Sequence, residues 1–214
     1  MEHESVLRAN LTDESAINKW LEAYSIHTNT SWIVQKVVKE GERMVFHKVW
    51  RCQYHSRNKK TDRRNAGCMA SLDIKIKKLA RGTKQNDAFL RKEVPLVAVI
   101  RIDSRHTHST QSADALRLLR PTTSTRETFL HYVDDGMTPT EARRLHESKL
   151  CLEDNGPQLL ASGAMNPQQR TVYYWHSVWR AVSFGGGNID PLTKLEEKAA
   201  SVYAAQGTTG LHDG

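Results

Sequence analysis

Four side chains in the first half of the chain have the types and spacing of a metal-binding set. Cys52 and Cys68 are separated by 15 residues, and 37 residues separate Cys68 from a His-x-His pair, His106 and His108. Two thiolates and two imidazoles suit the tetrahedral coordination that structural zinc prefers. Because four protein ligands leave no position for a water molecule, the predicted site organises the fold and carries out no reaction.

The His-x-His pair is the more specific half of this pattern. In an extended segment alternate side chains face the same way, so His106 and His108 can both reach one ion. The long intervals leave an alternative open, in which the two cysteines are buried as small apolar residues and the two histidines are solvated. His55 is the substitute ligand that the pattern offers, whereas Cys151 falls in a helical apolar pattern and fits a core or surface thiol.

The elements around these residues are predicted to be strands. Apolar residues alternate with polar ones along four segments, which indicates four antiparallel strands at about 32–38, 44–54, 70–77 and 94–102. The alternation in the second segment places Cys52 on the same face as Phe46 and Trp50. The fourth segment leads directly to the His-x-His pair. We therefore expect a small, four-stranded antiparallel β-domain whose segments are held together by zinc.

Helical periodicity replaces this alternation on either side of the β-domain. A short amphipathic helix is predicted at 11–24, and further helices are predicted at 112–119, 123–133, 138–150, 167–182 and 191–205. The α+β chain is thus divided into an N-terminal helix and linker at 1–30, a zinc-binding β-domain at 31–110, an α-helical domain at 111–206 and a disordered tail at 207–214.

The charge of the chain is concentrated in the predicted β-domain. The whole chain has a net charge of +7, but residues 1–30 have a net charge of −3 and residues 109–214 a net charge of −2. Residues 31–108 contain 19 basic and seven acidic side chains and have a net charge of +12. A localised positive field of this kind is typical of proteins that bind a polyanion.

The basic residues that we expect to contact DNA lie in two places. Five crowd the loop between the two cysteines and two share the outward face of the third predicted strand: Arg57, Lys59, Lys60, Arg63 and Arg64, then Lys75 and Lys77. If zinc holds both ends of that loop, its cations have a fixed base from which to contact phosphates. The alternative is a solvated loop without a partner.

From Trp32 to Ser109, about 80 of the 214 residues, the chain resembles the zinc-binding β-domains of the WRKY/GCM and FLYWCH superfamily of transcription factors and Mutator-like transposases. The resemblance rests on Trp50-x-Cys52, Cys68 and the closing His106-x-His108. The ligand intervals are longer than is usual in FLYWCH domains, and the chain has no WRKYGQK-like strand; transposase-derived members of the far-red-response type are more similar in spacing. The resemblance implies a four-stranded sheet held by zinc and sequence-directed contact with DNA.

The second half of the chain leaves a further DNA-binding alternative open. Residues 125–150 have the outline of a helix-turn-helix, and the helix predicted at 167–182 includes Arg170 and Arg180, which suit a recognition helix. The net charge of −2 in this half argues against it as the main DNA-binding region. It is also a candidate surface for protein partners.

The remaining motifs argue against an enzyme and against a membrane protein. The chain contains no P-loop, nucleophile elbow or HExxH motif, no apolar signal core, and no run of the roughly 18 to 20 apolar residues that a membrane span needs. We expect a nuclear, zinc-dependent protein that binds double-stranded DNA as a transcription regulator or transposase-derived module. The alternative is a zinc-stabilised protein-interaction adaptor that binds no nucleic acid.

Overall fold

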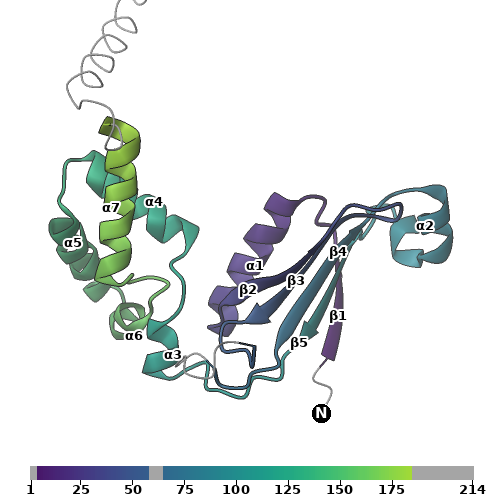
Figure 1. The fold of residues 1–214 in the computed structure, drawn as a ribbon, viewed down its shortest axis with the longest axis horizontal. Helices are drawn as coiled ribbons and strands as arrows, with labels where there is room; N and C mark the ends of the chain where they lie inside the picture. The colour runs from purple at the N-terminus through teal and green to yellow at the C-terminus, as the bar shows by residue number, and fades with distance from the viewer. Residues whose placement is uncertain (1–3, 58–64, 185–214) are drawn as a thin grey trace, which may run out of the picture. The chain divides into compact units, whose positions relative to one another are not determined.

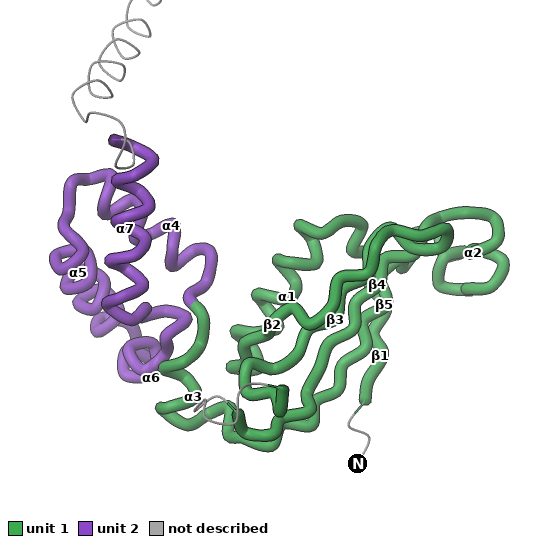
Figure 2. Tube along the Cα trace, viewed as in Figure 1, with its two compact units in different colours: residues 1–120 green, residues 121–214 purple. Residues whose placement is uncertain are grey.

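The computed structural model describes residues 4–57 and 65–184. The chain forms two compact units, residues 1–120 and residues 121–214 (Figure 2). The helix predicted at 191–205 and the disordered tail predicted at 207–214 lie outside the described residues.

The first unit is built on a five-stranded antiparallel sheet with the strand order β1-β5-β4-β3-β2 (Figure 1). In chain order the strands are β1 (Glu4–Ala9), β2 (Trp32–Val38), β3 (Met44–Cys52), β4 (Ser71–Lys77) and β5 (Ala98–Asp103). The coarse prediction of an α+β chain with an antiparallel sheet is confirmed. The prediction of four strands is wrong, because β1 adds a fifth.

One face of the sheet is covered by helix α1 (Glu14–Thr28). Along β4, Leu72, Ile74 and Ile76 are buried and alternate with half-buried polar residues, and the helix contributes Ile17 to the same core. Burying each of these aliphatic side chains contributes about 2 kcal/mol of hydrophobic stabilisation. The face beneath α1 is therefore the core of this unit, and the opposite face carries the polar half of the pattern.

Strand β1 was missed in the sequence because it lacks the periodic signal of a core strand. It pairs with β5 from Glu4 opposite Asp103 to Ala9 opposite Ala98, but Val6 and Leu7 are both exposed. Backbone hydrogen bonds with β5 hold this edge strand, and its side chains bury little apolar surface. Residues 1–30, which the sequence analysis set apart from the β-domain, thus supply an edge strand and the covering helix of unit 1.

The connection between β4 and β5 contains two short helices where the sequence indicated only a polar linker. They are α2 (Arg81–Asn86) and the 3-10 helix η1 (Ala88–Arg91). Asp87 lies between them and is buried; its carboxylate accepts hydrogen bonds from Arg8 of β1 at 2.8 Å and from Lys77 of β4 at 2.6 Å. It also accepts from the backbone N–H of Phe89 at 3.0 Å. Asp87 therefore ties this connection to two strands.

Between β5 and Phe184 the chain forms helices, as predicted. Helix α3 (Ala113–Arg117) belongs to the first unit, and the second unit contains α4 (Thr123–Asp134), α5 (Pro139–Cys151), α6 (Gly156–Ala161) and α7 (Gln169–Phe184). Helix α5 begins with a capping box of Thr138 and Glu141 and has a proline in its first turn. Gly136 has a φ of +86° in the turn before it, a conformation that favours glycine. Helix α6 lies in a segment that the sequence indicated as a loop.

We predict that Asp87→Asn lowers the free energy of unfolding of unit 1 by about 3 kcal/mol at neutral pH, because it leaves Arg8 and Lys77 without their shared carboxylate. Burial alone would raise the pKa of Asp87, but hydrogen bonds from Lys77 and Arg8 outweigh it and hold that pKa below its ordinary value. The stabilisation is therefore complete above the unfolded carboxyl pKa and is lost as the pH falls through the lower folded value.

Urea denaturation of both proteins across this pH range measures the effect. The difference between wild type and variant should narrow in acid. Glu93→Gln is the matched control, since Glu93 is an exposed carboxylate of the same segment. An Asp87 variant as stable as the Glu93 variant at pH 7 would contradict the prediction.

Candidate metal centre

The four residues of the predicted metal set converge at one end of the sheet. Cys52 is the last residue of β3, and Cys68 lies just before β4 in an isolated bridge with His55. His106 and His108 follow the end of β5. Because β3 and β5 both run antiparallel to β4, the ends of β3 and β5 and the start of β4 meet at the same end of the sheet. Both cysteines are buried and both histidines are half-buried.

The separations of the ligand atoms fit a tetrahedral ion. One sulfur or ring nitrogen from each residue lies within 4.8 Å of the others. The two nitrogens that face each other, Nδ1 of His106 and Nε2 of His108, are 3.3 Å apart. The Sγ of Cys52 lies 3.2 Å from Nε2 of His108, and the Sγ of Cys68 lies 3.6 Å from Nδ1 of His106.

These values can be compared with the geometry of zinc. With Zn–S bonds of about 2.3 Å and Zn–N bonds of about 2.0–2.1 Å, a tetrahedral ion sets nitrogen–nitrogen separations of about 3.3 Å and sulfur–nitrogen separations of about 3.6 Å. The nitrogen–nitrogen separation and that between Cys68 and His106 match these values, and the separation between Cys52 and His108 is shorter. Cys52, Cys68, His106 and His108 form a group that can bind a metal ion.

The surroundings of the two imidazoles orient the nitrogens that face the cluster. Nδ1 of His108 lies 2.9 Å from the backbone carbonyl of Ser109 and donates its hydrogen there, so the lone pair of Nε2 faces the cluster. The ring of His108 packs on Tyr54 with centroids 4.3 Å apart, and the ring of His106 packs edge-on against Trp32 at 5.8 Å. These contacts orient both rings toward the cluster.

Backbone hydrogen bonds hold the two cysteines beside each other. The N–H of Tyr54 donates to the Sγ of Cys52 at 3.5 Å, and the carbonyl of Tyr54 accepts from the N–H of Cys68 at 3.1 Å. Thr107 donates its hydroxyl to the carbonyl of Ala66 at 2.8 Å, which joins the histidine segment to the cysteine loop. Three segments distant in sequence thus meet at the cluster.

The two thiols are electrostatically coupled. The hydrogen bond with Cys68, together with burial, raises the pKa of Cys52, and the same hydrogen bond lowers the pKa of Cys68. Loss of both protons would leave two adjacent buried thiolates, which repel each other. A divalent cation removes that repulsion and allows both sulfurs to be thiolates.

The other candidate ligands from the sequence lie outside the cluster. The Nδ1 of His55 accepts a hydrogen bond from the N–H of Arg57 at 3.0 Å, and His55 does not belong to the group of four. Cys151 is exposed at the end of α5 in the other unit. The bridge between His55 and Cys68 gives His55 a role in shaping the backbone next to the site.

The predicted DNA-contact residues divide into three groups. Arg57 is exposed at the start of the loop between the cysteines. Lys75 and Lys77 lie on the sheet face opposite the core, as predicted, but each already faces a carboxylate: Asp73 at 3.3 Å and Asp87 at 2.6 Å. Four further predicted contacts lie outside the described residues: Lys59, Lys60, Arg63 and Arg64.

Two arginines of the open sheet face were missed by the sequence reasoning. Arg101 of β5 stands opposite Asp73 in the register, and Arg51 of β3 stands opposite Ser71, so both share the face of Lys75. Arg101 is exposed. The alternation of side chains along each strand could have identified them. Arg51 lies between Trp50 and Cys52, and Arg101 lies between Ile100 and Ile102, so each arginine belongs to the face opposite these apolar residues.

Aromatic side chains of α7 contact the helices of the second unit in which the sequence suggested a helix-turn-helix. Trp175 of α7 lies against Phe129 of α4 with ring centroids 5.9 Å apart, and Nε1 of Trp179 donates to Asp134 at 2.6 Å. Both tryptophans are half-buried and join α7 to α4.

Comparison of the chain with known protein families, with curated proteins and with solved structures finds no match. Among the described residues, no helix is both long and apolar enough to cross a membrane.

We predict that the full chain binds one equivalent of Zn²⁺ or Co²⁺ and that Cys52→Ser or His108→Ala abolishes this binding, because each substitution removes one of four ligands. The visible absorption of tetrahedral cobalt measures the binding. Metal removal with a chelator should also lower the unfolding temperature, since the ion joins three segments of unit 1.

Two matched controls accompany this experiment. Cys151→Ser removes a thiol in the other unit, and His55→Ala removes an imidazole next to the cluster; both variants should keep the full stoichiometry. Retained cobalt absorption in the Cys52 variant, or a chain indifferent to metal, would refute the site.

Proposed function

We propose that this protein is a zinc-dependent, double-stranded-DNA-binding protein in which the metal has a structural role. The observation that carries the proposal is the convergence of two thiols and two imidazoles within 4.8 Å, inside a segment with a net charge of +12. The cluster supplies a fixed base, and the surrounding cations supply the attraction for phosphate. The proposal assigns no catalytic residue, because four protein ligands complete a tetrahedral sphere.

The position of the basic loop supports DNA as the partner. Cys52 precedes this loop and Cys68 closes it, so an ion at the cluster holds both ends. Five cations fall between them in the sequence: Arg57, Lys59, Lys60, Arg63 and Arg64. Cations that neutralise phosphates release condensed counterions, which makes duplex binding strong and steeply dependent on salt. The two open-face arginines, Arg51 and Arg101, extend the positive surface along the sheet.

The same ligand order supports membership of the WRKY/GCM and FLYWCH superfamily. Both cysteines and the His-x-His pair lie at one end of an antiparallel sheet, and they follow one another along the chain in the order that the resemblance implies. A transcription regulator or a transposase-derived DNA-binding module, located in the nucleus, is the form of function that this membership favours.

A second candidate, a zinc-stabilised protein-interaction adaptor, rests on helix α7. Its side chains Tyr173, Tyr174 and Val182 are all exposed although they are large and apolar in part. The described helices around it do not cover them. In this second proposal the helical unit contacts a protein partner and unit 1 binds no nucleic acid.

We predict that Arg63→Glu/Arg64→Glu weakens duplex binding at least tenfold and reduces the salt dependence of the binding constant, by about 0.9 in the log–log slope for each phosphate that the variant no longer neutralises. Fluorescence anisotropy with a labelled duplex, measured over a series of salt concentrations with zinc present, gives both quantities.

Arg126→Glu/Arg144→Glu is the matched control, because it makes the same change of charge on exposed helix positions of the second unit. Equal reductions of affinity in both double variants would indicate a non-specific charge effect and would contradict the assignment of the loop, whereas a wild-type chain that binds no duplex would favour the adaptor. Selection from a random duplex library then separates the two candidates, since only a DNA-binding protein enriches a sequence motif.

A further inference from the structure

A basic pocket lies at the end of the sheet that is remote from the metal cluster. The connection between β4 and β5 forms an open pocket of about 580 Å³ lined by Leu79, Arg81, Lys84, Gln85 and Arg91. Three of its five lining side chains are cations, and none is an acid. The residues come from the segment around α2 and η1, which the sequence analysis treated as a connection without a function.

The three cations are not neutralised within the described part of the chain. No hydrogen bond or ion pair joins Arg81, Lys84 or Arg91 to a carboxylate among residues 4–57 and 65–184. Asp87 belongs to the same segment, but its buried carboxylate is already held by Arg8 and Lys77. The positive charge of the pocket is therefore available to a ligand.

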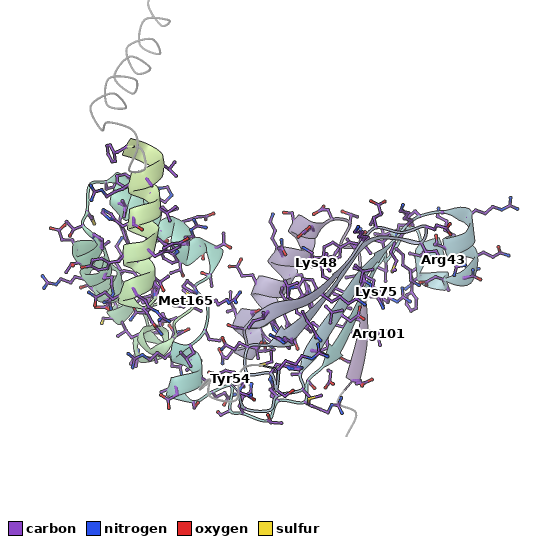
Figure 3. All side chains as sticks on the ribbon, viewed as in Figure 1. Arg43, Lys48, Tyr54, Lys75, Arg101 and Met165 are labelled. Atoms are coloured by element: carbon purple, nitrogen blue, oxygen red, sulfur yellow. The ribbon has the colours of Figure 1, made fainter. Side chains whose placement is uncertain are left out.

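A neighbouring carboxylate, that of Glu40, is also paired. Lys78 forms an ion pair with Glu40 at 2.7 Å, which joins this connection to the turn between β2 and β3. The N–H of Lys78 also donates to the carbonyl of Arg43 at 3.0 Å. Arg43 is thus held at the same end of the sheet (Figure 3). The carboxylates stabilise the framework, and the cations that remain face the pocket.

The chemistry of the lining selects an oxyanion. A guanidinium binds phosphate through two parallel N–H donors, and a lysine ammonium adds a compact point charge. The amide of Gln85 can donate to a third oxygen. We infer that this pocket binds a phosphate group, and that its physiological source is the backbone of the nucleic acid bound by unit 1. The second clause rests on the proposed function, whereas the first does not.

The distance between the pocket and the metal cluster determines how much of a DNA duplex contacts at both sites would span. Strand β4 begins three residues after Cys68 and ends four residues before Arg81. Its seven residues span about 20 Å at a rise of about 3.3 Å per residue. Tyr54, beside the metal cluster, and Arg43, beside α2, lie at opposite ends of the sheet (Figure 3). Contacts at both ends would cover about six base pairs, since successive phosphates of one strand are about 3.4 Å apart along the axis.

Inorganic phosphate tests the pocket without any nucleic acid. The ¹⁵N-labelled full chain is titrated with sodium phosphate, and sodium chloride at equal ionic strength is the reference. Saturable shifts of the backbone amides of residues 79–91 are expected with phosphate, and they should be abolished in Arg81→Gln/Lys84→Gln. Absence of shifts beyond those caused by chloride would overturn the pocket.

Duplex binding tests the source of the phosphate. Arg81→Gln/Lys84→Gln should weaken duplex affinity about tenfold and reduce the log–log salt slope by about 0.9, the value for one phosphate contact. The control is Lys19→Gln/Lys92→Gln, which removes the same charge from two exposed lysines that do not line the pocket. Unfolding temperatures of both variants establish that each is folded.

The outcomes separate this inference from the proposed function. If phosphate shifts the pocket amides but the pocket variant binds duplex like its control, the pocket takes a free phosphate group and the nucleic-acid source is overturned. If the wild type binds no duplex at all, the proposed function fails, and the phosphate titration alone decides the pocket. Weaker binding in both experiments, confined to the pocket variant, supports the inference in full.

Discussion

The close approach of two sulfurs at the end of the sheet is the constraint on which this structure depends. The hydrogen bond between the two thiols raises the pKa of Cys52 and lowers the pKa of Cys68, because two adjacent thiolates in a buried site repel each other. A divalent cation coordinated by both sulfurs and two imidazoles removes the repulsion and fills every coordination position. The turn after β3, the chain before β4 and the chain after β5 are then joined at one point, although Cys52 and His108 are 56 positions apart in the sequence.

The antiparallel sheet makes this convergence possible. Strand β4 pairs with β3 on one side and with β5 on the other, so the sequence-distant ends of β3 and β5 are brought to the start of β4. At the opposite end of the sheet, Asp87 has the corresponding role, since it binds cations from β1 and β4. Unit 1 is thus held at one end by a group that can bind metal and at the other by a buried carboxylate.

The sequence predicted the features that rest on local periodicity and on side-chain type. Alternation located β2 to β5 within a few residues, and the His-x-His spacing indicated two ligands on one side of an extended segment. Strand β1 could not be predicted, because its stabilisation comes from the backbone of β5 and its side chains carry no core pattern. Helices α2 and α6 have six residues each, too few to show a helical period. Their stability comes from contacts that only the fold creates.

The distribution of acidic residues in unit 1 explains why its positive field is available to a partner. Asp73, Asp87 and Glu40 each pair with a lysine of β4 or of the segment after it, so the carboxylates are used inside the framework. The pocket cations Arg81, Lys84 and Arg91 have no carboxylate partner among the described residues, so their charge adds to the positive field of unit 1. If an anion binds there, it supplies the negative charge that the carboxylates of the framework do not.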